Sequence, residues 1–296
     1  MLKAIISIFL SSFFFSTMEV ALKMVSTELE PLQITFIRFL IGGLVLLPFG
    51  INYIEKNSVK LNKKDYAYMF LLGIICVPVS MIFFQLGVEN SNASTAAVIF
   101  CANPLFTILF AHFITDEKMK RRTVLALLLG MVGILFMVEP WNMGEGNTIK
   151  GFFCILAAAL TFGLYSVLGK RSIGKIGSFP QISISFLFGT FVLMCINFVT
   201  DTSMIKGIDP VNLPVILYIG IGVTGLGYLF YFIAMEKSDA TTASLVFFIK
   251  PVLAPLIAIL IMNEAVTLSG WIGIGLILTA SFINLKFKKH EAGEAV

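Results

Sequence analysis

The sequence has few charged residues. Only 13% of its 296 residues are charged, whereas 58% are hydrophobic and the mean hydropathy is +0.95. Soluble domains carry about 25% charge, so this chain has too little polar surface to coat a water-soluble globule. The small positive net charge of +4 falls mainly in short loops between apolar runs, which argues against a nucleic-acid partner. A lipid bilayer is the expected surrounding.

Residues that build metal and catalytic centres are also scarce. The four cysteines each lie inside an apolar run, and the two histidines are far apart in the sequence. No pair of cysteines or histidines has metal-ligand spacing, and the sequence contains no CxxC, HExxH, GxSxG or GxxxxGK[ST] pattern. Carboxylates are single and scattered. We therefore expect no metal, no cofactor and no enzymatic activity.

Long apolar runs fill the chain instead. A helix needs about 20 residues to cross the hydrocarbon core, and ten runs of this size can be marked. They are 4–25, 32–51, 66–87, 93–114, 122–140, 150–170, 180–199, 214–235, 241–262 and 268–286. The connections are short, which favours antiparallel neighbours. The predicted fold class is all-α integral membrane.

The distribution of lysine and arginine predicts how these spans are oriented. Sixteen of the 21 fall on one side if there are ten spans, and only Lys150 and Lys206 fall in loops on the other. Because cytoplasmic loops carry the excess of positive residues, we expect both termini in the cytoplasm. The tail at 287–296 is then a cytoplasmic tail.

An internal repeat appears when the chain is shifted by 147 residues. Residues 73–117 then match residues 220–264 at 14 of 45 positions without a gap. Each copy holds five spans, so the second copy is inverted relative to the first. The expected domains are a first repeat at 4–140 and a second at 150–286. Inverted repeats are typical of secondary transporters.

The repeated motif resembles a known family. Both copies contain the pattern Glu-x-Ser-x-Ala-[ST]-Thr-Ala before a span with a central proline, and a glutamate ends that span. This pattern, with ten helices, resembles the drug/metabolite transporter superfamily with two EamA-type repeats. The resemblance implies export of metabolites or amino acids across a bacterial cytoplasmic (inner) membrane, often driven by proton exchange. It says little about the substrate.

Lys250 is the strongest candidate for the substrate site. It lies about ten residues into its span, where a lysine costs about 2.5–3.5 kcal/mol and should face the protein interior or water. Pro251 and Pro255 follow it. Prolines remove helical hydrogen bonds, so we expect a helix break that leaves free carbonyls beside a cation. The alternative is a lysine that only pairs with a carboxylate to fix the helix.

Asn103 is the repeat mate of Lys250, and it precedes Pro104, a third expected helix break. Thr95 and Thr107 lie near it on the fourth span, as Thr242 does near Lys250. We expect these two polar stripes to face each other across a central cavity. Hydrogen bonding between helices is the competing interpretation for all of them.

Glu19 lies on a polar face of the first span. Its depth allows an ion pair with Arg38 or Lys23, and we favour a structural pair for Arg38. A carboxyl in a low-dielectric site also takes up a proton more readily, so Glu19 is a candidate for carrying a coupling proton or binding a substrate ammonium.

Three further side chains are candidates for the cavity wall: Tyr165, Tyr228 and Gln85. Most aromatic residues in so aromatic a chain must instead face lipid or pack helices. Glu117 and Glu264 end their spans, where helix capping or a local ion pair is the expected role. The glycines of the fifth and tenth spans predict a close packing seam between them.

The sequence thus leads to the hypothesis of a secondary transporter. It would export a small polar or zwitterionic metabolite, such as an amino acid or amine, by alternating access, with the proton as the candidate coupling ion. Uptake or uncoupled facilitation is the first alternative, and a membrane enzyme or non-transporting sensor is the second. Monomer and homodimer both remain open.

Overall fold

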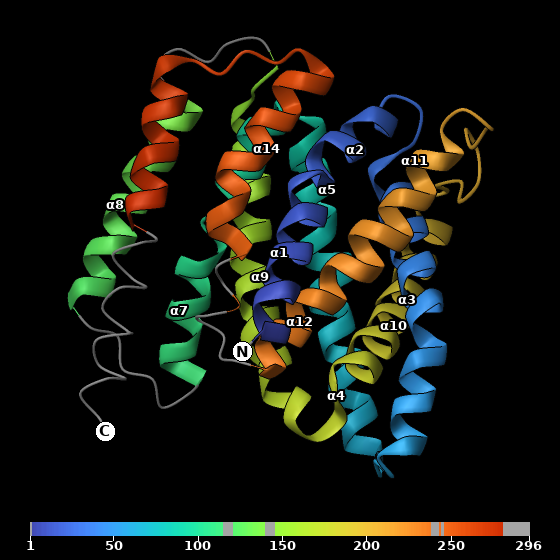
Figure 1. Ribbon diagram of the computed structural model, residues 1–296. Coiled ribbons are helices and arrows are strands. Elements are labelled where there is room, and N and C mark those ends of the chain that lie inside the picture. The colour runs from blue at the N-terminus through green and yellow to red at the C-terminus, as the bar shows by residue number, and fades with distance from the viewer. Residues whose placement is uncertain (1, 115–120, 140–145, 238–242, 244–245, 281–296) are drawn as a thin grey trace.

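The protein is a bundle of membrane-spanning helices (Figure 1). The computed structural model describes residues 2–114, 121–139, 146–237, 243 and 246–280. Seven helical stretches are long and apolar enough to cross a membrane, and three shorter apolar helices, Leu128–Met137, Ile249–Met262 and Leu268–Ala280, accompany them. These ten helices form two inverted repeats of five. The expected cytoplasmic tail and the end of the last span, from residue 281 on, lie outside the described residues.

The first repeat contains nine named elements. They are α1 (Leu2–Ser16), α2 (Met18–Val25), α3 (Pro31–Lys56), α4 (Lys63–Ile74), η1 (Ile75–Met81), α5 (Ile82–Glu89), α6 (Ala93–Phe100), α7 (Asn103–Ile114) and α8 (Arg121–Val138). The second contains α9 (Ile149–Ile176), α10 (Ser178–Val199), α11 (Leu213–Leu217), η2 (Tyr218–Gly227), α12 (Tyr228–Lys237), α14 (Val246–Met262) and the helix Leu268–Ala280. We call the end where α3, α9 and α12 finish the lysine-rich end; it lies at the bottom of Figure 1.

The first span is interrupted at Thr17. Before this point, the hydroxyls of Ser12 and Ser16 donate to the carbonyls of Ile8 and Ser12, four residues back. Such bonds compete with the helical ladder and bend helices. The chain restarts as α2, which places Glu19 in the first turn of a new helix.

Two spans contain a π-helical segment at matching positions of the repeats. Residues 75–80 of η1 are the mates of residues 222–227 of η2 under the 147-residue shift. Pro78 lies within η1, where its missing N–H favours a rearranged ladder. Such π-helical segments are frequent at functional sites. Both are in the third span of their repeat.

The two repeats meet at an aromatic core in which residues contact their own repeat mates. Such contacts arise where a pseudo-twofold axis passes through a structure. They are Phe39–Phe186 with ring centroids 4.7 Å apart, Phe100–Phe247 at 6.3 Å, and the Tyr228 hydroxyl 3.2 Å from the Met81 sulfur. The centre of the molecule is therefore a densely packed aromatic layer to which both halves contribute.

Glycines allow the closest helix approaches. A Cβ on Gly73 of α4 would lie 2.2 Å from the Ser185 carbonyl oxygen of α10, and one on Gly189 would lie 2.4 Å from the Gly73 carbonyl oxygen. A Cβ on Gly273 would lie 2.6 Å from the Gly133 carbonyl oxygen, so α8 and the helix Leu268–Ala280 pack directly together, as the left side of Figure 1 shows. The predicted seam between the fifth and tenth spans is present.

Candidate functional site

A buried ion pair joins the two repeats. The Lys250 amine on α14 donates to Glu19 Oε1 on α2 at 2.5 Å, and the two side chains are 0% and 1% exposed. In Figure 1 the orange α14 lies beside the blue first span. Breaking a buried pair by removing one partner costs about 3–5 kcal/mol. Each charge therefore requires the other, and the pair lies across the boundary between the first and second halves of the molecule.

Aromatic rings surround the lysine. Its amine lies 5.1 Å from the centre of the Phe100 ring and 5.8 Å from that of the Phe84 ring. α6 ends at Phe100. It cannot continue, because the ring of Pro104 would then clash with the Phe100 carbonyl four residues earlier. Cation–π contacts of this kind stabilise a buried ammonium.

Glu19 does not pair as the sequence led us to expect. Its partner is Lys250, and neither Arg38 nor Lys23 lies within ion-pair distance of it. Lys23 instead donates to the carbonyls of Val88 and Ser91 at the end of α5. The reason is packing, because α2, which carries Glu19, contacts α14, which carries Lys250. Its second oxygen, Oε2, has no hydrogen-bond partner among the described residues.

Arg38 is left without a carboxylate among the described residues. It is 1% exposed, and its Nη1 makes only a 3.8 Å contact with the Met18 sulfur, while Nε and Nη2 are unpartnered. Its guanidinium carbon also lies 4.8 Å from the Phe39 ring centre. The expected structural ion pair of Arg38 is therefore wrong.

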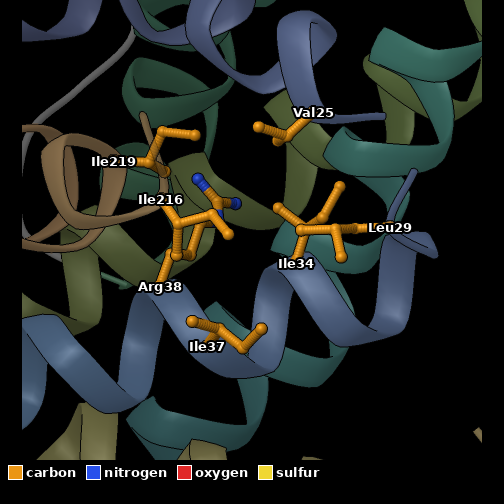
Figure 2. A pocket seen from close by; sticks show the side chains of 7 residues that line it. All are labelled: Val25, Leu29, Ile34, Ile37, Arg38, Ile216 and Ile219. Atoms are coloured by element: carbon orange, nitrogen blue, oxygen red, sulfur yellow. The ribbon is translucent and has the colours of Figure 1, made fainter. Parts of the chain in front are cut away.

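A pocket lies above the Arg38 guanidinium. Figure 2 shows this side chain among apolar residues of α2, α3 and the α11–η2 segment. The pocket is small, about 10 Å³ in volume, which is room for about one water molecule, and it is lined by Val25, Leu29, Ile34, Ile37, Arg38, Ile216 and Ile219. These elements place it at the end opposite to the lysine-rich end.

Asn103 is engaged in helix packing. Its Nδ2 donates to the Ala159 carbonyl of α9 at 3.0 Å, and its Oδ1 accepts from the Thr107 hydroxyl at 3.2 Å. The first bond joins two helices and the second is local, as expected if Asn103 serves helix packing rather than the substrate. Thr242, on the partner stripe, lies outside the described residues, so the expectation that the two stripes face each other stays a prediction.

Pro251 and Pro255 do not break their helix. α14 runs without interruption from Val246 to Met262 and contains both prolines. The expectation of a break at these two positions is corrected. α14 packs on α1, α2 and α6, and a transmembrane helix tolerates prolines when its neighbours satisfy the freed backbone groups. Pro104 lies instead at the second position of α7, after a turn at Cys101 and Ala102.

The remaining candidates are buried near the aromatic core. Tyr228 contacts Phe39 and Phe186 and donates to a methionine sulfur, and Tyr165 packs on the Phe162 and Phe232 rings. Gln85, in contrast, is 0% exposed, and neither its Oε1 nor its Nε2 has a partner among the described residues. An unpartnered buried amide is costly, which keeps Gln85 a candidate for polar contacts with a ligand.

Glu264 caps a helix of the other repeat. Its carboxylate accepts from the backbone N–H groups of Ala93 and Ser94 and from the Ser94 hydroxyl, at 2.7–3.0 Å. A carboxylate at a helix N-terminus is favoured by the helix dipole. This cap joins the second repeat to α6 of the first repeat, at the end opposite to the lysine-rich end. Its repeat mate, Glu117, lies outside the described residues.

Sequence reasoning missed the role of two groups of residues. It assigned Arg38 to an ion pair, and it did not single out Phe84 and Phe100 as contacts of Lys250. The sequence does hold a signal that Arg38 lacks a carboxylate partner. Its helical neighbours at 34 and 37 are isoleucines, and few carboxylates lie within the apolar runs. The chain has 29 phenylalanines, and no sequence pattern distinguishes Phe84 and Phe100 from the others as contacts of Lys250.

Comparison with known proteins agrees with the fold and the repeat. A solved crystal structure superposes on the model with a TM-score of 0.71 and 17% identity, covering 96% of each chain. A relative from Clostridium kluyveri named an uncharacterized transporter is 38% identical over 98% of this chain and 95% of its own. An S-adenosylmethionine uptake transporter of Rickettsia prowazekii is 25% identical over 83% of this chain and 80% of its own.

The family model settles the class of protein. The model of the EamA-like transporter family matches twice, at residues 2–139 and 149–286. The names of the family and of these relatives indicate a membrane transporter rather than an enzyme. With its ten helices in two inverted repeats, the chain belongs to the EamA-like transporter family.

Proposed function

We propose that this transporter exports a small polar or zwitterionic metabolite, such as an amino acid or amine, by alternating access. The observation that carries the proposal is the buried Glu19–Lys250 pair, which joins α2 of one repeat to α14 of the other. Any exchange between inward-open and outward-open shapes moves one repeat against the other. A ligand that breaks an ion pair between the two repeats can therefore influence the exchange between the inward-open and outward-open shapes.

The chemistry of the pair suits a zwitterion. With no ligand, each charge satisfies the other, and a buried charge left alone would cost several kcal/mol. A zwitterion can separate them without leaving either unpaired, because its carboxylate binds Lys250 while its ammonium binds Glu19. The rings of Phe84 and Phe100 then lie beside the bound charges. A simple amine offers a partner for Glu19 alone.

Glu19 is also the proposed carrier of a coupling proton. Its Oε2 has no hydrogen-bond partner in the described part of the chain, so this oxygen is free to take a proton. Protonation would remove the negative charge and release Lys250. A proton and an ammonium would then compete for one carboxylate, which is the basis of exchange between them.

Uptake is the second candidate direction. The observation that favours it is the relative from Rickettsia prowazekii, which is named an uptake transporter and matches over most of both chains. Both directions use the same site and the same exchange of shapes. A gradient imposed in either direction across proteoliposomes separates them.

The test is transport into proteoliposomes containing the purified protein. The probes are radiolabelled leucine, threonine, lysine and putrescine, each with and without an imposed pH gradient. We expect at least one probe to accumulate, and we expect Lys250→Ala to abolish that accumulation. Lys175→Ala is the matched control, because this lysine pairs with Asp65 at the surface, 2.6 Å away. Wild-type transport by a well-folded Lys250→Ala protein would overturn the proposal.

A further inference from the structure

Three helices from the two repeats meet between the Glu19–Lys250 pair and the end opposite to the lysine-rich end. α14 of the second repeat packs on α2 and α6 of the first, and in Figure 1 the upper turns of α14 lie beside α2. α2 carries Glu19, α14 carries Lys250, and α6 ends at Phe100 beside the lysine. Contacts farther along these three helices, toward the opposite end, therefore separate the ion pair from the surface at that end.

A carboxylate joins two of these helices at that surface. Glu264 follows α14, and its Oε1 accepts from the Ala93 N–H of α6 at 2.7 Å. Its Oε2 accepts from the N–H and the hydroxyl of Ser94 at 3.0 and 2.7 Å. Hydrogen bonds to an ionised group are roughly twice as strong as neutral ones. One side chain of the second repeat thus holds the start of a first-repeat helix.

The end of α14 fixes the position of this carboxylate. The helix ends at Met262, and Asn263 adopts a left-handed conformation with a φ of 52°. Asparagine enters this region more readily than most residues, and it is one of the residues that commonly follow a helix end. Glu264 is the next residue, so its position depends on a defined helix end rather than on a long loop.

A small apolar cluster lies between the carboxylate and the ion pair. Val20 of α2, Ala93 of α6 and Ala258 of α14 are buried and pack together, apart from the main core. Val20 follows Glu19 in the sequence, and Ala258 lies eight residues from Lys250 toward Glu264, about 12 Å along the helix. Because two of the three side chains are alanines, separating the helices exposes little apolar surface.

Lys23 holds together the part of this junction that belongs to the first repeat. Its amine donates to the carbonyls of Val88 and Ser91, just before α6, and its charge interacts with those of Glu264 and Glu89. α2 and the start of α6 are thus joined within one repeat, whereas Glu264 reaches them from the other. A movement of α14 away from the first repeat would break the bonds of Glu264 and leave those of Lys23 in place.

We propose that α2, α6 and α14 form a gate over the ion pair and that Glu264 holds this gate closed. When the carboxylate leaves α6, the apolar cluster separates, and the Glu19–Lys250 pair becomes accessible from the end opposite to the lysine-rich end. The inference rests on the proposed function, since the substrate would reach or leave the pair through this gate.

The thiol reactivity of Val20→Cys measures opening of the gate without requiring transport. The variant is made in a protein without its four native cysteines and is alkylated with a hydrophilic maleimide in detergent. Val20 is 2% exposed, so the reaction should be slow. Glu264→Ala should accelerate it by roughly 2- to 30-fold, the change that loss of a helix cap implies. Equal rates with and without Glu264→Ala would overturn the inference.

Asn62→Ala separates opening of the gate from a general loss of stability. The Asn62 side chain accepts from the Asp65 N–H at 3.0 Å and caps α4 at the lysine-rich end, so the variant loses a helix cap far from the gate in the chain. It should lower the melting temperature and leave the alkylation rate of Val20→Cys unchanged. The same acceleration by Asn62→Ala and Glu264→Ala would contradict the gate.

Cross-linking tests the gate during transport. Ser94→Cys and Glu264→Cys place thiols on two residues whose side chains are in contact, and a short bifunctional methanethiosulfonate joins them reversibly. The linked protein should lose counterflow of any probe that the wild-type protein moves, and a reducing agent should restore it. Each single cysteine variant, treated in the same way, is the control. Counterflow by the linked protein at the rate of the unlinked protein would contradict the inference.

Failure of the gate and failure of the proposed function give different results. A linked protein that still moves a probe contradicts the gate and leaves the transporter proposal intact. Selective acceleration of alkylation by Glu264→Ala, in a protein whose wild type moves none of the four probes, supports the gate and contradicts the proposal of amino acid or amine transport.

Discussion

At the residue scale, charge pairing determines the character of the site. Three charged side chains of the described core lie close together: Glu19 and Lys250 are paired, and Arg38 is not. The pair is neutral and crosses the repeat boundary, while the arginine faces a separate pocket. The two features differ in kind, since the pair joins the repeats and the arginine lies beside apolar side chains.

Double substitution tests the energetic role of the pair. Lys250→Met and Glu19→Leu should each lower the free energy of unfolding by about 3–5 kcal/mol, because each leaves a buried charge alone. The double variant should recover much of that loss, since no lone charge remains. Denaturant unfolding in detergent measures the cycle. Additive losses in the double variant would show that the two side chains act independently.

Asn103 should contribute to stability rather than to transport. Its Nδ2 bond to the Ala159 carbonyl crosses from α7 to α9, and such bonds between transmembrane helices contribute about 0.6 kcal/mol on average, up to about 1.7. Asn103→Leu should cost about that much and leave the transport rate of the folded protein within a factor of two. A selective loss of transport at unchanged stability would place Asn103 in the substrate site instead.

At the element scale, hydropathy and spacing were sufficient for the helices but not for their interruptions. The ten predicted runs correspond to helices, because length and apolar composition decide whether a segment crosses a bilayer. The breaks depend on local competition for hydrogen bonds, so Ser12 and Ser16 interrupt the first span, whereas Pro251 and Pro255 leave α14 continuous. A proline alone therefore does not predict a break in a membrane-spanning helix.

Glycine contacts between α4 and α10 provide a test of helix packing. Gly73→Ala would place a methyl group 2.2 Å from the Ser185 carbonyl oxygen, whereas Gly275→Ala would meet nothing within 4 Å. Overpacking typically costs about 1–3 kcal/mol, so Gly73→Ala should lower the melting temperature. Gly275→Ala should leave it unchanged or raise it, because alanine favours helix. Equal effects would contradict the close approach of α4 and α10.

At the scale of the whole molecule, the repeat was the most informative feature of the sequence. A match of 14 positions at a shift of 147 residues predicts two related halves, and mates such as Phe39 and Phe186 meet in the core. The site itself is asymmetric, since Lys250 corresponds to Asn103 and Glu19 to Ser166. Which charges pair could not be predicted, because depth in the membrane alone allows Glu19 several partners.

The charge distribution makes a prediction about orientation. We propose that the lysine-rich end faces the cytoplasm, since positive residues favour that side. Single cysteines at Lys60 and Lys206 should then differ in labelling of intact cells by a membrane-impermeant thiol reagent, with Lys206→Cys reacting and Lys60→Cys reacting only after lysis. All four native cysteines are first replaced by serine or alanine. The reverse pattern would invert the proposed orientation.

The most direct test of alternating access through the Glu19–Lys250 pair is solute counterflow in proteoliposomes. Vesicles loaded with unlabelled leucine should take up labelled leucine through the wild-type protein, because exchange needs no gradient. Glu19→Gln should slow this exchange, because the substrate ammonium loses its carboxylate partner, and should lose accumulation driven by a pH gradient, since it cannot carry the proton. Lys250→Ala should lose both. Counterflow and gradient-driven uptake by both variants at wild-type rates would contradict the account.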